Sequence, residues 1–191
     1  MHELSQMIKD DMKPALGVTE PGAIAFAVAK ARSFTKGDIK KVNVAMNSGM
    51  YKNAFTCGIP NSNEVGNVFA AALGVVAGNA DKGLESLADV TPEDNVKAQE
   101  MIDQGKVTVE LSGITSRIFI EATVETEEDK AIVTIRDSHT NITKITVNDK
   151  VELETEDEKK TEEDGGEEEA HSIHKYTLQQ LYDYVTTVDI E

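Results

Sequence analysis

The sequence predicts an α+β fold, in which alanine-rich helices pack against an antiparallel β-meander. Two observations point to this class. In the first half, apolar residues recur at helical spacing, and near residue 106 the period of the apolar pattern changes from 3.6 to 2. A third observation concerns size: 191 residues, of which 39% are hydrophobic, are enough for one buried core. We therefore expect a single domain over residues 1–191.

The first two helices are expected near the N-terminus. Residues 3–12 have Leu4, Met7 and Ile8 on one side, which is typical of a short amphipathic helix. A second helix is expected over residues 20–31, because Glu20-Pro21 suits the first helical turn. This segment is apolar nearly all round, and such a helix is buried.

A strand and three more helices are expected before residue 105. Residues 38–49 alternate apolar and polar side chains, which predicts a half-buried strand. Residues 61–79 predict the next helix, since Asn61 and Glu64 resemble a capping box. Shorter helices are expected near residues 83–89 and 92–104.

The second half predicts strands, an acidic loop and a last helix. The four expected strands of the meander are residues 106–113, 116–126, 130–138 and 141–149. Asn148-Asp149 is typical of a two-residue hairpin turn. Residues 152–170 predict a mobile loop, because so acidic a run buries too little apolar surface to offset its ordering entropy. A helix over residues 176–191 follows, with Thr177 and Gln180 as a capping box.

Composition excludes several classes of function. The net charge is −16, and more than half of it falls within residues 152–169. This acidity argues against nucleic acid and against anionic membranes, which both attract clustered Lys and Arg. No apolar run approaches the roughly 20 residues of a membrane span, and the first residues lack the apolar region of a signal peptide. With Cys57 as the one cysteine, no intrachain disulfide can form, so we expect a cytoplasmic protein.

Three segments together resemble a known family of lyases. They are "KPALGVTEPGAIAFAVAKA" (13–31), "YKNAFTCGIPNSNEVGNVFAAALGVVAGNADKGLESLADVT" (51–91) and "HTNI" (139–142). In this order and spacing they are similar to the amino-terminal half of the L-cysteine desulfidase and L-serine dehydratase alpha-chain family. The resemblance implies a lyase that releases sulfide or water from L-cysteine or L-serine and leaves pyruvate and ammonia.

The resemblance also implies an iron–sulfur cluster, for which this chain lacks the cysteine ligand at the expected position. Full-length members of the family hold a [4Fe–4S] cluster with three cysteines, of which the first occupies the position of Val18. A valine side chain has no lone pair for iron. Cys57 aligns with an apolar position of the family, and we interpret it as a small buried hydrophobe. The family's Pro-Gly-Thr-Gly turn is replaced by residues 60–63, Pro-Asn-Ser-Asn. We therefore expect no metal or cofactor in this chain and no activity from it alone.

Candidate substrate-binding residues lie in the first two segments. At the start of the second helix, Thr19 offers a hydroxyl and Glu20 a carboxylate, which suits the ammonium group of an amino acid. The alternative is that these residues only cap the helix. Lys52 and Asn53 are expected beside them if the helices pack as the resemblance implies, with Asn53 orienting the ligand. The alternative for this pair is an ordinary surface turn.

The third segment supplies a candidate acid or base. His139 follows a strand, and its imidazole can exchange a proton near neutral pH, with Thr140 and Asn141 as binding neighbours. The alternative is a turn closed by an Asx-type asparagine. His171 and His174 have helical spacing, but a solvated stretch explains them more simply than a metal site does.

Three hypotheses for the function are open. The first is the amino-terminal half of the lyase, which works with a separate carboxy-terminal half or subunit on L-cysteine or L-serine. The second is a non-catalytic relative that binds a small molecule or a partner protein. The third is a cluster-free enzyme that uses Glu20 and His139 as acid and base, although the sequence does not place these two together. The alanine- and glycine-rich helix over 64–79 is a candidate contact for the absent half or for a second copy of the chain.

Overall fold

A computed structural model of the chain describes residues 2–12, 14–115, 117–155 and 173–188. These residues fall into two compact units, which we describe separately. The larger unit is Pro14–Asp157, and the smaller unit combines Met1–Lys13 with Glu158–Glu191. The expectation of one domain over the whole chain stays a prediction.

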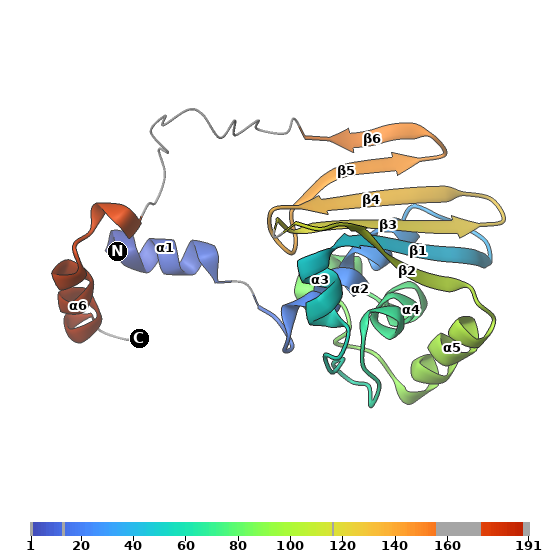
Figure 1. Ribbon diagram of the computed structural model, residues 1–191, viewed down its shortest axis with the longest axis horizontal. Helices are drawn as coiled ribbons and strands as arrows, with labels where there is room; N and C mark the ends of the chain where they lie inside the picture. The colour runs from blue at the N-terminus through green and yellow to red at the C-terminus, as the bar shows by residue number, and fades with distance from the viewer. Residues whose placement is uncertain (1, 13, 116, 156–172, 189–191) are drawn as a thin grey trace. The chain divides into compact units, whose positions relative to one another are not determined.

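The larger unit is built on a six-stranded mixed sheet with helices on one face (Figure 1). The strand order is β2-β1-β3-β4-β5-β6, and every neighbouring pair is antiparallel except β1 with β2. The strands are β1 (Ile39–Asn47), β2 (Val107–Gly113), β3 (Phe119–Thr126), β4 (Lys130–Arg136), β5 (Ile142–Val147) and β6 (Lys150–Glu154).

The predicted α+β class is confirmed, with one correction to the meander. The segment expected as its first strand, 106–113, is β2, which pairs in parallel with β1 at the edge of the sheet. The meander consists of β3 to β6, because residues 150–154 form a further strand, of which we assigned residues 152–154 to the acidic loop. Parallel pairing needs a long crossover connection, and the helices between β1 and β2 supply it.

Apolar and polar side chains alternate along the strands, so that one face of the sheet is apolar and packs against the helices. On that face Val42, Val44 and Met46 of β1 are fully buried, together with every second residue of β3 and β4. The helices that cover it are α2 (Thr19–Arg32), α3 (Ser48–Ala54) and α4 (Asn67–Ala77). The 3₁₀ helix η1 (Ala80–Glu85) packs on α2, and α5 (Pro92–Asp103) packs on α4. Burial of this apolar surface is what holds the sheet and the helices together.

Small residues let α2 and α4 pack closely. A Cβ on Gly74 would lie 2.7 Å from the carbonyl oxygen of Ala25, and one on Gly78 would lie 2.7 Å from the Cβ of Ala29. Both contacts advance by one helical turn in both helices, so α2 and α4 run in the same direction. Their N-termini therefore lie at the same end of the helix pair.

The helix expected over 61–79 begins later than predicted. Helix α4 starts at Asn67, and its N-cap is Gly66, which has φ of +94°. The predicted capping box of Asn61 with Glu64 is wrong, because Asn61 has a left-handed φ of +58° and donates its side-chain amide to the carbonyl oxygens of Leu87 and Ala88. The seven-residue helix α3 was not expected, since it is too short to show a helical period.

One predicted cap is confirmed, and one further capping box was not predicted. Helix α5 begins at Pro92, and its capping box of Thr91 with Asp94 was not expected from the sequence. In the smaller unit, α6 (Leu178–Thr187) has the predicted capping box of Thr177 with Gln180. The left-handed φ values of Asn148 and Asp149 also agree with the predicted hairpin turn.

The smaller unit contains α1 (Glu3–Asp11), the 3₁₀ helix η2 (Ile173–Lys175) and α6. The hydroxyls of Ser5 and Tyr184 lie 2.7 Å apart, and Glu3 accepts a hydrogen bond of 2.6 Å from the Tyr176 hydroxyl and pairs with Lys175. The remainder of the predicted acidic loop and His171 lie outside the described residues. Within the described residues, none of the helices has the length and hydropathy of a membrane span.

Candidate functional site

The start of α2 leaves its first backbone N–H groups without a side-chain cap. Its N-cap is Val18, whose hydrocarbon side chain makes no capping hydrogen bond and is 48% exposed. The first turn of a helix has N–H groups without intrahelical acceptors and carries the positive end of the helix dipole. This end of α2 therefore suits a ligand with a negative group.

Four side chains from three segments meet at this point, and we call them the α2 cluster: Thr19, Glu20, Asn53 and His139. The Thr19 hydroxyl donates to Glu20 Oε2 at 3.4 Å and lies 3.5 Å from His139 Nε2. Asn53 donates from Nδ2 to Glu20 Oε1 at 3.0 Å. The two carboxylate oxygens of Glu20 are thus held from two sides, at the surface of the larger unit.

The turn between β4 and β5 brings His139 to α2. Its base is closed by two hydrogen bonds between Arg136 and Asn141: the Arg136 N–H donates to the Asn141 carbonyl oxygen, and Asn141 Nδ2 donates to the Arg136 carbonyl oxygen, each at 3.1 Å. Thr140 lies against η1, since its Cγ2 is 4.0 Å from the Cβ position of Gly83. The same 3₁₀ helix packs on α2, because a Cβ on Gly22 would lie 2.8 Å from the Leu84 carbonyl oxygen.

The structure brings together only part of the predicted site. Thr19, Glu20, Asn53 and His139 converge, although no sequence pattern places Glu20 near His139. Asn141 closes its own turn, as in the alternative interpretation. Lys52 is exposed, and among the described residues no hydrogen bond or ion pair joins its side chain to the cluster. The roles of all these residues stay predictions.

A second helix N-terminus near the cluster was not predicted. Gly66, the N-cap of α4, packs against the turn that follows α3, since its Cβ position lies 2.8 Å from the Phe55 carbonyl oxygen. Its N–H donates to the Cys57 carbonyl oxygen at 3.0 Å, and Cys57 Sγ in turn lies 2.7 Å from the Asn53 carbonyl oxygen. Local patterns missed this connection because it depends on how α3 and α4 pack.

The residues at the start of α2 do not fit an iron–sulfur cluster. Val18 offers no ligand atom, and the Cys57 thiol donates to a backbone carbonyl. Cys57 is half-buried, so its interpretation as a buried hydrophobe is corrected. Over the described ranges, no three His, Cys, Asp or Glu side chains are grouped as metal ligands. A cluster of this kind needs several thiolates.

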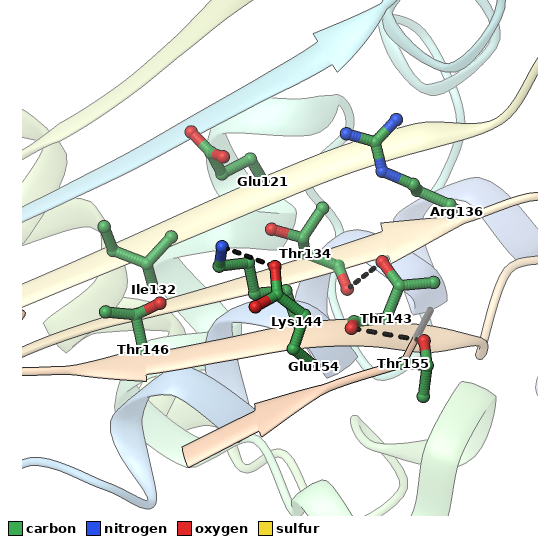
Figure 2. A pocket seen from close by; sticks show the side chains of 9 residues that line it. All are labelled: Glu121, Ile132, Thr134, Arg136, Thr143, Lys144, Thr146, Glu154 and Thr155. Atoms are coloured by element: carbon green, nitrogen blue, oxygen red, sulfur yellow. Dashed lines mark hydrogen bonds and ion pairs between the residues drawn. The ribbon is translucent and has the colours of Figure 1, made fainter. Parts of the chain in front are cut away.

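A hollow lies on the sheet face that the helices leave open (Figure 2). Its volume is about 680 Å³, and its lining comes from β3 to β6 and the residue that follows β6. Lys144 and Glu154 pair across it at 2.7 Å, and the Thr143 hydroxyl donates to the Thr134 carbonyl oxygen at 3.5 Å. The α2 cluster is the stronger candidate for a binding site, because it lies at a helix N-terminus whose N-cap residue makes no capping hydrogen bond.

Curated relatives are UPF0597 proteins of Clostridium botulinum. A UPF0597 protein of strain Hall is 34% identical over 187 residues, which cover 97% of this chain and 43% of the relative. Another from the same strain is 37% identical over 157 residues, covering 82% of this chain and 36% of the relative. One from strain Loch Maree is 34% identical over 98% of this chain and 42% of the relative. The chain thus spans less than half the length of these relatives. No protein-family model and no solved structure matches it.

Proposed function

We propose that this chain, homologous to UPF0597 proteins over nearly its whole length, is the amino-acid-binding part of a lyase similar to the L-cysteine desulfidases and L-serine dehydratases. The observation that carries the proposal is the α2 cluster. It places a carboxylate, a hydroxyl and an imidazole at the uncapped N-terminus of a helix.

These groups are complementary to a small α-amino acid. The free N–H groups of the first turn of α2 suit the ligand carboxylate. Glu20 suits its ammonium group, and Asn53 holds one oxygen of Glu20 in place. His139 and Thr19 remain for the hydroxyl or thiol of L-serine or L-cysteine, where an imidazole can accept or return a proton.

The isolated chain is proposed to bind the amino acid without converting it. Val18 stands where the family has a cluster cysteine, so the chain holds no cofactor of its own in this proposal. A separate carboxy-terminal half or subunit is then the partner that supplies the remaining chemistry, and a second copy of the chain is the alternative partner. The single cysteine favours a reducing, cytoplasmic setting.

Isothermal titration of the 191-residue chain with L-serine and L-cysteine tests the binding. We expect saturable binding, and Glu20→Gln is expected to weaken it at least about tenfold, because it removes the negative charge that faces the ammonium group. Glu121→Gln, a carboxylate on the opposite face of the sheet, is the matched control and should leave the affinity unchanged. No heat from the unmodified chain, or equal binding by Glu20→Gln, contradicts the proposal.

Anaerobic incubation with iron and sulfide tests the predicted lack of activity. We expect no cluster absorption band and no pyruvate from L-cysteine or L-serine. A brown sample that forms pyruvate would show that the chain is a complete enzyme.

The identity of Val18 favours a second candidate function, a non-catalytic domain that kept only the binding site. A pull-down separates the two candidates. Recovery of a polypeptide that restores pyruvate formation supports the lyase part, and a partner without such activity supports the binding domain.

A further inference from the structure

Asn67, the first residue of α4, has a donor that nothing in the described residues accepts. Its side chain is 3% exposed, and Nδ2 has no hydrogen-bond partner there. Its Oδ1 accepts the N–H of Val68 at 3.0 Å, which fixes the orientation of the amide. An unsatisfied buried amide is costly, and native proteins rarely keep one without a reason.

The position of Asn67 on α4 directs it to the end of the helix pair where α2 begins. It lies seven residues before Gly74, on the stripe of α4 that Gly74 and Gly78 place against α2. The partner of Gly74 is Ala25, and seven residues before Ala25 is Val18. Since the helices run in the same direction, Asn67 faces the first turn of α2.

The positive ends of two helix dipoles, those of α2 and α4, lie at this same end of the helix pair. Neither Val18 nor Gly66, the N-cap residues of α2 and α4, makes a capping hydrogen bond from its side chain, and both helices are long enough for a full dipole. Hydrogen bonds from Gly66 through Cys57 and Asn53 connect the start of α4 to Glu20. A leftover N–H donor between two such termini suits a carboxylate.

We propose that Asn67 is a ligand-binding residue that donates from Nδ2 to the carboxylate of the amino acid bound at the α2 cluster. This inference rests on the proposed function, and it adds a residue that determines specificity for a free carboxylate over a neutral amide. Glu20 recognises the ammonium end of the ligand, and Asn67 the other end.

The test compares L-serine with L-serinamide, in which a neutral amide replaces the carboxylate. For Asn67→Leu, which has a similar volume, we expect L-serine to bind about tenfold to a hundredfold more weakly. Binding of L-serinamide should change little, so the preference for L-serine is lost. Asn67→Asp should lose L-serine binding through repulsion, yet fold well because a carboxylate is favourable in the first turn of a helix. Asn63→Leu, in the exposed loop before α4, is the control.

Thermal unfolding without ligand separates this role from a structural one. Asn67→Leu should melt at or above the temperature of the unmodified chain, because the unsatisfied amide is gone. A lower melting temperature together with an unchanged preference for L-serine overturns the proposal. If Asn67→Leu does not fold, the affinities of Asn67→Asp for L-serine and L-serinamide decide. Retained preference of this variant for L-serine overturns the proposal. Loss of binding in Glu20→Gln but not in the Asn67 variants leaves the proposed function standing without this inference, and no binding by the unmodified chain ends both.

Discussion

At the scale of single residues, the α2 cluster combines poor helix capping with good ligand chemistry. Val18 is an unfavourable N-cap residue, because Ser, Thr, Asp and Asn there accept the N–H groups of the first turn. A side-chain cap at this position would also occupy the donors that the proposed carboxylate needs. Val18 thus gives the helix less stability than a capping residue would, and it leaves the N–H groups of the first turn available to a ligand.

Val18→Ser should therefore stabilise the protein and weaken its binding. Val18 has extended φ and ψ of −61° and 129°, which a serine N-cap adopts, so we expect a gain of about 1 kcal/mol in the free energy of unfolding. Urea denaturation measures the gain, and titration with L-serine should show reduced affinity. A variant that is less stable and binds normally would mean that the N–H groups of α2 are already satisfied.

Sequence reasoning named all four residues of this cluster as candidates, but it did not place His139 beside the others. Thr19 and Glu20 adjoin a proline that suits a helix start, so their position followed from local rules. The approach of His139 depends on how β4 and β5 pack beside α2, and no local pattern encodes it. Asn67 was missed because it lay inside the helix expected over 61–79, and only its burial shows the unpaired donor.

At the scale of elements, the packing of α2 on α4 sets the geometry of the site. The apolar period predicted both helices but not their relative direction, just as it predicted β2 but not its parallel pairing with β1. The relative direction of two packed helices depends on which of their surfaces are complementary. Here Gly74 and Gly78 allow the close contact of α4 with Ala25 and Ala29 of α2.

Gly74→Ala should destabilise the protein in spite of alanine's better helix propensity. The new Cβ would lie 2.7 Å from the Ala25 carbonyl oxygen, and overpacking of this kind costs about 1–3 kcal/mol. Gly17→Ala is the control, because nothing lies within 4 Å of its Cβ position. Chemical denaturation measures both, and a neutral Gly74→Ala would argue against close contact of the helices.

The capping box of α5 should make stability depend on pH. Hydrogen bonds from the hydroxyl and N–H of Thr91, with the charge of Lys97, lower the pKa of Asp94 below its usual 3.8. A lowered pKa means that the folded state favours the carboxylate, so the contribution is present above about pH 3.8 and is lost as the pH falls through the lower folded value.

Asp94→Ala tests this dependence. At neutral pH it should cost about 1 kcal/mol of the free energy of unfolding, as the loss of a cap does. The difference from the unmodified protein should stay constant from about pH 7 to 5 and shrink below about pH 4. Denaturation curves over this range check it, and a difference that persists under strong acid would assign the effect to something other than ionised Asp94.

At the scale of the whole molecule, the core and the candidate site both belong to the larger unit. The main hydrophobic cluster of the described residues lies between Ala23 and Val147, and the α2 cluster and Asn67 lie within Pro14–Asp157. We therefore expect a fragment of residues 14–157 to fold on its own, since its sheet and helices bury each other's apolar faces.

This fragment should unfold in one cooperative transition and bind L-serine with the affinity of the full chain. It also lacks most of the acidic run, so equal binding would show that this charge takes no part in recognising a zwitterion. Calorimetry and titration of the two proteins side by side measure both properties. A fragment that folds but binds at least about tenfold more weakly would place part of the site outside residues 14–157, and Glu20 and Asn67 would then be insufficient to explain recognition.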